Sequence, residues 1–245
     1  MFDWFRKKDI KVKLTPLSVD VHSHLLVGID DGVQHLEDAA LIISHFKQAG
    51  YSKLITTPHV MSDAYRNTTE GILNKLDELR AYLKEKQIAM EMDAAAEYYL
   101  DQYTFDMVAN NERMLTFGGD KRYLLFETNF LSEPMNLREF IFIATSKGFT
   151  PVLAHPERYL YLQTDWKKMQ DIYDRGVLFQ LNISSITGYY SKGVQITAQK
   201  MIDHGWVQFL GSDCHHHQHA LLATSAVKMK YYQKALSLPL LNNSL

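Results

Sequence analysis

Short apolar segments alternate with longer amphipathic stretches along this sequence, and this alternation restricts the fold most. Seven segments are predicted to be strands: residues 18–21, 53–56, 91–95, 122–126, 150–153, 178–181 and 207–210. Six amphipathic stretches are predicted to be helices: residues 35–49, 68–86, 136–147, 165–175, 196–204 and 221–236. Residues 101–120 are less periodic and predict one short helix with a loop. Such alternation is typical of a parallel sheet that is buried on both faces.

The predicted fold class is therefore α/β. Seven strand–helix units in a chain of 245 residues favour a small closed barrel, although periodicity alone leaves an open sheet as the alternative. No linker or low-complexity tract divides the chain. We expect a leader over residues 1–17 and a single domain over residues 18–245.

Composition narrows the class of partner. The net charge is -2, so no basic excess indicates a nucleic-acid partner. No apolar run reaches the roughly 18 residues of a membrane-spanning helix. The leader lacks the apolar core of a secretory signal. Cys214 is the single cysteine, which forbids an intrachain disulfide and fits a reducing, cytoplasmic location.

Polar side chains follow the predicted strands at one end. In parallel α/β proteins functional groups gather at the carboxyl ends of the strands. Each residue alone is explained as a polar strand end or as half of an ion pair, but the set predicts a metal site. Histidines or carboxylates follow six of the seven strands: His22, His24, Asp31, His59, Glu97, Glu127, His155, Asp213 and His215. The remaining strand ends at Asn182.

Nine candidate ligands exceed the four to six that one ion takes. They imply at least two ions, and three if a carboxylate bridges. Nitrogen and oxygen donors suit Mn²⁺, Fe or Zn²⁺. Cys214 lies between two candidates in "DCH" and is expected to point away from them. Residue 220, six after Cys214, is an alanine, so the C-x₅-R pattern of thiol phosphatases is absent.

The stretches "DVHSHLLVGIDDG", "TTPH", "AEYYL", "LLFET", "VLAHPERY" and "GSDCH" resemble the PHP (polymerase and histidinol phosphatase) superfamily. Within it they are most similar to the metal-dependent tyrosine phosphatases of bacterial capsular and exopolysaccharide synthesis. The resemblance spans residues 19–215 and implies a distorted, TIM-like (β/α)₇ barrel with Mn²⁺. It implies a first ion held by His22, His24, Glu97 and Asp213. Glu97 would bridge to a second, shared with Glu127 and His155, and Asp31, His59 and His215 would hold a third.

The resemblance also implies metal-assisted hydrolysis of a phosphomonoester. Arg158 is expected to grip the phosphate, the alternative being an ion pair with Glu157 or a neighbour. Asp30, or a histidine after His215, is expected to supply a proton. The family commonly has a phosphate-binding arginine after the last metal motif. This chain has "CHHHQHALL" instead, so His216, His217 or His219 takes that place or Arg158 acts alone.

Three functions remain open at this point. The first is a protein-tyrosine phosphatase whose partner is the phosphotyrosine tail of a bacterial kinase, which would place it near the inner face of the membrane. The second is a phosphatase or phosphodiesterase for a metabolite such as histidinol phosphate, or for a nucleotide. The third is a catalytically silent metal-binding scaffold. A peptide needs an open rim and a metabolite an enclosed pocket, and six tyrosines either frame such a rim or pack in the core: Tyr98, Tyr99, Tyr159, Tyr161, Tyr189 and Tyr190.

Overall fold

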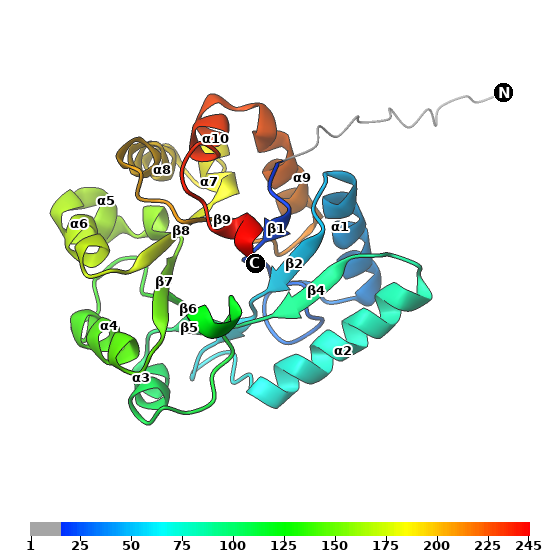
Figure 1. The fold of residues 1–245 in the computed structure, drawn as a ribbon, viewed down its shortest axis with the longest axis horizontal. Helices are drawn as coiled ribbons and strands as arrows, with labels where there is room; N and C mark the ends of the chain where they lie inside the picture. Colours follow the sequence, from blue (N-terminus) through cyan, green and yellow to red (C-terminus); the bar gives the residue numbers. More distant parts are fainter. Residues whose placement is uncertain (1–15) are drawn as a thin grey trace.

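The structure is a computed structural model that describes residues 16–245. Most of the leader expected over residues 1–17 lies outside the described residues. Within the described part, parallel strands form a ring with helices around the outside, and the C-terminus lies at the centre of the ring in this view (Figure 1).

Seven of the nine strands in the described residues occupy the predicted positions, with shifts of up to two residues at their ends. The nine are β1 (Val19–Asp20), β2 (Lys53–Thr56), β3 (His59–Val60), β4 (Glu91–Ala94), β5 (Glu97–Tyr99), β6 (Tyr123–Glu127), β7 (Thr150–Ala154), β8 (Leu178–Asn182) and β9 (Phe209–Gly211). Of these, β3 and β5 were not predicted. One sheet has the order β1-β2-β4 and the other the order β3-β5-β6-β7-β8-β9. β2 and β3 follow one another along one extended segment of the chain, and so do β4 and β5. The register is unchanged across the break, because Lys53 faces Glu91 and His59 faces Glu97.

The ring closes between the first and last strand positions. Ser23 and Cys214 form a parallel bridge, and the backbone N–H of Asp213 donates to the carbonyl of His22 at 2.8 Å. The buried carboxylate of Asp20 accepts from the backbone N–H and the hydroxyl of Ser212, at 2.8 and 2.6 Å. These bonds bring the end of the β1 segment against the end of the β9 segment, which places the residues that follow both strands side by side.

The helices cover the outer face of the ring. They are α1 (Leu36–Gln48), α2 (Thr69–Glu85), α3 (Gln102–Ala109), α4 (Leu137–Ser146), α5 (Leu160–Thr164), α6 (Trp166–Asp174), α7 (Ile183–Thr187), α8 (Lys192–His204), α9 (His217–Ser225) and α10 (Lys230–Ala235). Short 3₁₀ turns are η1 (Gly119–Lys121), η2 (Pro156–Arg158), η3 (Ala226–Lys228) and η4 (Asn242–Ser244). No helix within residues 16–245 combines the length and apolar character that crossing a bilayer requires.

Two helix predictions were inaccurate. The helix expected at residues 196–204 begins earlier, at Lys192, because the Ser191 hydroxyl caps it by accepting from the Val194 N–H. The single helix expected at residues 221–236 is two helices, α9 and α10. The hydroxyl of Ser225 bonds to the carbonyl of Leu222 within its own helix, and the backbone turns extended at Met229.

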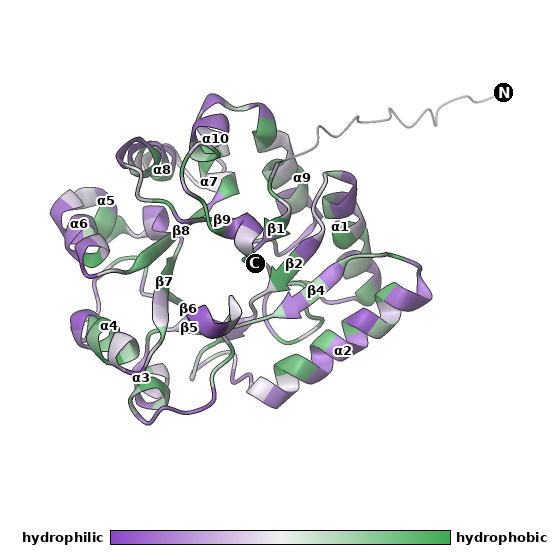
Figure 2. Cartoon of the chain, in the orientation of Figure 1, coloured by the Kyte–Doolittle hydropathy of each residue, from purple (hydrophilic) through white to green (hydrophobic). Residues whose placement is uncertain are grey.

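Two apolar layers hold this arrangement. The outer layer lies between strands and helices, and α2 carries hydrophobic and hydrophilic residues side by side along its length (Figure 2). The inner layer fills the ring with side chains such as Val19, Leu125, Val152 and Phe209. The rings of Phe117 and Tyr123 pack against Phe209, with centroids 5.3 and 5.1 Å away. These side chains fill the half of the ring at the amino ends of the strands, which we call the lower half. The carboxyl ends of the strands are therefore the end that is open to solvent.

The inner layer gives a test of the fold. Phe209→Ala removes a fully buried ring that two other aromatic rings contact. We expect it to lower the free energy of unfolding by about 3–5 kcal/mol, measured by urea denaturation. The matched control is Phe142→Ala, because Phe142 is 72% exposed on α4, and it should change stability by less than about 0.5 kcal/mol. Equal effects of the two substitutions would contradict the packed interior.

Candidate metal centre

The nine predicted ligands meet at the carboxyl ends of the strands, because each lies at or just beyond a strand break or end. His59 begins β3 and Glu97 begins β5, and the two residues are paired across the strands. Glu127 ends β6, and His155 follows β7 directly. The remaining ligands lie on the turns after the closing strands β1 and β9: His22, His24, Asp31, Asp213 and His215.

Two of these residues have a strained backbone. His155 has φ of 36° and Asp213 has φ of 50°, in the left-handed region that non-glycine residues seldom adopt. Such strain persists only where the surrounding structure determines it, and it clusters at functional sites. Here it turns both side chains back over the end of the ring.

The most deeply buried group consists of His22, His24, Glu97 and Asp213. The Nε2 atom of His22 lies 3.2 Å from Glu97 Oε2, 3.4 Å from Asp213 Oδ1 and 3.3 Å from His24 Nε2. His24 Nε2 lies 3.5 Å from the same two oxygens. Ligands about 2.1 Å from a tetrahedral ion lie about 3.4 Å from one another, so His22, His24 and Asp213 are spaced as ligands of one ion would be. Glu97 Oε2 lies at a similar distance from both histidines.

Glu97 extends this group towards two further ligands. His155 Nε2 lies 2.9 Å from Glu97 Oε1 and 3.9 Å from Glu127 Oε2. His59 Nδ1 lies 3.2 Å from Glu97 Oε2 and 3.1 Å from Glu127 Oε1. The ligand atoms expected for a second ion thus fall into two overlapping groups, one with His155 and one with His59, and Glu97 is common to both.

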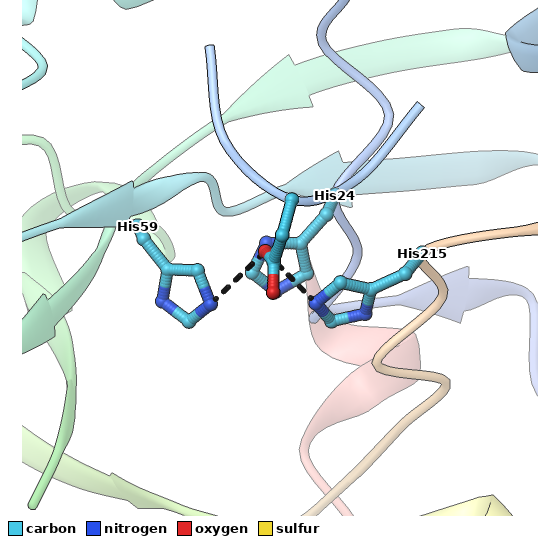
Figure 3. Close-up of side chains that lie close together, drawn as sticks. His24, His59 and His215 are labelled. Atoms are coloured by element: carbon cyan, nitrogen blue, oxygen red, sulfur yellow. Dashed lines mark ion pairs between the residues drawn. The ribbon is translucent and has the colours of Figure 1, made fainter. Parts of the chain in front are cut away.

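The third group is the most exposed. His59 and His215 direct their Nε2 atoms at one carboxylate from opposite sides, with His24 behind it (Figure 3). That carboxylate belongs to Asp31, whose Oδ1 lies 3.5 Å from His59 and 3.4 Å from His215. Asp31 is half exposed, whereas the first group is almost fully buried. The ligands therefore run from the interior of the ring to its mouth.

Buried polar atoms in this cluster are left without hydrogen bonds. Among the described residues, Glu97 Oε2 and His59 Nδ1 have no hydrogen-bond partner, although both are buried. Burial alone would raise the pKa of Glu97, but the neighbouring rings of His22 and His59 hold it well below its usual range. A buried carboxylate oxygen and a nearby imidazole nitrogen that both lack hydrogen bonds fit a divalent cation bound between them.

Asp30, the predicted proton donor, contacts two of the candidate ligands. Its Oδ2 accepts from His24 Nδ1 at 2.8 Å and from the His59 backbone N–H at 3.2 Å, and it is buried behind the ligands. Hydrogen bonds and the charges of these histidines outweigh burial and lower the pKa of Asp30. The position fits a group that orients His24.

The ligands open into a cavity of about 610 Å³. Arg158 is the only lysine or arginine among the described residues that line it. Its Nη1 lies 2.9 Å from Asp213 Oδ2. Arg158 therefore forms an ion pair, as the alternative to a phosphate role predicted, but its partner is Asp213 and not Glu157. The guanidinium also lies over the rings of Phe130 and Tyr190, with its Cζ atom 4.8 and 4.4 Å from their centroids. Sequence reasoning missed Phe130; its place three residues after Glu127 was the only signal.

The histidine run divides between two places. His216 and His219 line the cavity, whereas His217 lies against α1 with its ring 5.7 Å from that of His45. Burial lowers the pKa of His219 to about 4, so its neutral ring does not replace the charge of an arginine.

The remaining side chains singled out in the sequence fall clearly inside or outside the cavity. Tyr98, Tyr159 and Tyr161 are buried, and of the six tyrosines only Tyr189 and Tyr190 line the cavity. Cys214 is fully buried, and its thiol faces the carbonyl of His216, away from the ligands, as expected.

The cluster predicts an unusual pH dependence in the absence of metal. Burial would lower the pKa of His22, but the charges of Glu97 and Asp213 outweigh it and raise the pKa to about 9. A histidine with a raised pKa adds stability that is complete below about pH 6.5 and is lost as the pH rises through the folded value. We therefore expect the free energy of unfolding of chelator-treated protein to fall between pH 6.5 and 9 in urea titrations. Saturating Mn²⁺ should flatten this slope, and a metal-free slope of zero would contradict the interpretation.

Comparison with known sequences assigns this chain to a family. The sequence pattern described as "Capsular polysaccharide synthesis, CpsB/CapC" matches residues 18–237. Tyrosine-protein phosphatase CpsB of Streptococcus pneumoniae is 25% identical over 203 residues, which cover 80% of this chain and 82% of that protein. Tyrosine-protein phosphatase YwqE of Bacillus subtilis is 24% identical over 197 residues, which cover 80% and 77%.

Solved structures confirm the barrel-type fold. The structure described as "YwqE from Bacillus subtilis and CpsB from Streptococcus pneumoniae, unique metal-dependent tyrosine phosphatases" superposes with a TM-score of 0.80 at 22% identity, covering 90% of each chain. An amidohydrolase from Mycoplasma synoviae superposes with a TM-score of 0.54 at 12% identity, covering 94% of this chain and 87% of that one. With the family pattern matched over almost the whole described chain, this protein belongs to the CpsB/CapC family of capsular polysaccharide synthesis.

Proposed function

We propose that the protein is a metal-dependent phosphomonoester hydrolase that removes phosphate from phosphotyrosine. The observation that carries the proposal is the clustering of nine candidate nitrogen and oxygen ligands, seven of which line one open cavity beside a single arginine. The names of the curated relatives, which are tyrosine-protein phosphatases, support the choice of substrate.

The ligand groups support two or three ions, with Mn²⁺ preferred and Fe or Zn²⁺ as alternatives. We assign His22, His24, Glu97 and Asp213 to the first ion and Glu97, Glu127 and His155 to the second. Asp31, His59 and His215 are assigned to the third. Bound cations at such a site lower the pKa of water towards neutral and neutralise phosphoryl charge.

Arg158 is the phosphate-binding residue in this proposal. The rings of Phe130 and Tyr190 pack against its guanidinium. Burial lowers the pKa of Arg158, but the charge of Asp213 outweighs it and raises the pKa. A guanidinium fixed in this way suits the bidentate recognition of phosphate. We propose that Asp30 holds His24 in place. The reaction needs little help from a proton donor, because a phenolate leaving group has a pKa of about 10.

The cavity mouth favours an aromatic substrate on a peptide. Phe130 and Tyr189 line the cavity and are 37% and 42% exposed, so they offer ring surfaces to an incoming phenyl group. A rim with exposed aromatic side chains suits a peptide better than a small metabolite that must be enclosed. We propose the phosphotyrosine tail of a bacterial kinase as the partner, which would place the protein in the cytoplasm at the inner face of the membrane.

The first test compares substrates. Mn²⁺-loaded protein should hydrolyse a phosphotyrosine peptide with a higher kcat/KM than histidinol phosphate at matched concentration, and a chelator should abolish both activities. His59→Ala and Glu97→Ala each remove a ligand and should lower kcat/KM at least about 100-fold with an unchanged circular dichroism spectrum.

The control for these variants is His204→Ala, because His204 is an exposed histidine at the end of α8. Full activity in either ligand variant would contradict the mechanism. Preference for histidinol phosphate would move the function to metabolism, and metal binding without any turnover would indicate a silent scaffold.

The second test concerns Arg158. Arg158→Ala should lower kcat/KM for the phosphotyrosine peptide about 10–100-fold, mainly through KM, because a charged hydrogen bond to phosphate is lost. Arg158→Lys should restore only part of this, since an ammonium group cannot stack on the rings of Phe130 and Tyr190 as a planar guanidinium does. Arg138→Ala, on an exposed arginine that pairs with Glu133 and Asp171, is the control. An unchanged KM in Arg158→Ala would exclude the phosphate role.

A further inference from the structure

β8 differs from every other strand position of the ring, because it contributes no histidine or carboxylate. It reads "LFQLN", and alternation sends Phe179 and Leu181 into the outer apolar layer and Gln180 and Asn182 towards the centre of the ring. Both amide side chains are fully buried. Burying a primary amide is costly unless its oxygen and nitrogen find partners, so the partners of these two indicate their purpose.

The two amides form a chain of hydrogen bonds between two candidate ligands of the first ion. His22 Nδ1 lies 2.7 Å from Gln180 Oε1, and Gln180 Nε2 donates to Asn182 Oδ1 at 2.9 Å. Asn182 Nδ2 then donates to Asp213 Oδ2 at 2.6 Å. The chain thus runs from β1 through β8 to β9 across the interior of the ring.

The direction of every bond in this chain follows from its last member. An ionised carboxylate only accepts, so Asn182 must present its NH₂ to Asp213 and its oxygen to Gln180. Gln180 must then present its NH₂ to Asn182 and its oxygen to the ring of His22. His22 must then donate from Nδ1, and in the neutral ring this leaves the lone pair of Nε2 free on the side of Glu97.

We propose that Gln180 and Asn182 are positioning residues that fix the Nδ1–H tautomer of His22 and the rotamer of Asp213. This inference rests on the proposed metal-dependent function, because its purpose is to direct His22 Nε2 and Asp213 Oδ1 at one ion. Groups that hold the second nitrogen of a ligating histidine raise its affinity for metal. Asp30 does the same for His24 from another element.

Two neighbours hold the amide chain in place. The backbone N–H of Asn182 donates to the buried carboxylate of Glu157 at 3.0 Å, next to Arg158. Gly211 on β9 leaves the space that the chain occupies. A Cβ atom at Gly211 would lie 2.6 Å from Gln180 Nε2 and 2.8 Å from the Cβ of His22. Both features are expected if the position of these amides matters more than their burial alone.

The test separates positioning from general stability with Mn²⁺ as the probe. Gln180→Met removes both polar groups at similar size, and Asn182→Ala breaks the bond to Asp213. Each should weaken the tightest Mn²⁺ site about 10–100-fold in a titration followed by electron paramagnetic resonance. Gln180→Glu keeps an oxygen that accepts from His22 but loses the donor to Asn182, so it should recover only part of the affinity.

The matched control is Asn242→Ala. Asn242 is equally buried and its amide also bonds across the ring, to the carbonyls of Val19 and Leu210, but it contacts none of the proposed ligands. This variant should lower the melting temperature and leave Mn²⁺ affinity unchanged. Positioning is overturned if Gln180→Met binds Mn²⁺ as tightly as the natural protein, or if affinity falls in Asn242→Ala as far as in Asn182→Ala.

A second readout needs no metal. In ¹⁵N nuclear magnetic resonance spectra of metal-free protein at a pH where the ring is neutral, His22 should carry its proton on Nδ1, and in Gln180→Met it should show a mixture of tautomers. A fixed Nδ1–H tautomer in both proteins would overturn the proposal. Failure of the natural protein to bind Mn²⁺ would count against the proposed function, while this measurement would still decide whether the amide chain sets the tautomer.

Discussion

The structure depends on two carboxylates, Glu97 and Asp213, that lie in the interior of the ring with almost no exposure to water. An unpaired charge in such a place is costly, and the chain compensates by surrounding both groups with histidine rings. This constraint accounts for the strained backbone at His155 and Asp213, because only a sharp turn after each strand directs these side chains back over the ring. The bonds between the β1 and β9 segments serve the same end, since they bring the first and last ligands together.

The ring is divided along its axis into two chemically different halves. The lower half is filled by Phe117, Tyr123 and Phe209, and the upper half by histidines, carboxylates and amides. The apolar half makes a rigid base, because packed aromatic rings leave little freedom to the strands that carry the ligands. Within the polar half, burial decreases from His22 to Asp31, which leaves the outer ligands accessible to a substrate. A graded site of this kind combines fixed inner ligands with an open entrance.

Asp213 connects the parts of the site. Its Oδ1 faces His22 and His24, and its Oδ2 faces Arg158 and Asn182. The ligands, the proposed phosphate-binding arginine and the amide chain of β8 therefore share one carboxylate. Glu157, which precedes Arg158 in η2, accepts a hydrogen bond from the backbone of Asn182. A displacement of Arg158 would therefore also move the side chains around Asp213. The residues of "HPERY" thus act as a structural unit, beyond containing one candidate ligand and one cation.

The sequence by itself determined the strands, their parallel arrangement and the order of the nine candidate ligands, because apolar alternation and the strand-end rule depend only on neighbouring residues. It also indicated the family, through short motifs along most of the chain. It did not predict the short strands β3 and β5, the division of the last helix, the contact of Asp30 with His24 or the aromatic rings beside Arg158. Only the tertiary structure decided these contacts. His22 and Gln180 are 158 residues apart, and no local pattern states which strands will be neighbours across the ring. The role of a buried amide depends on its hydrogen-bond partners, and these partners come together only when the ring closes.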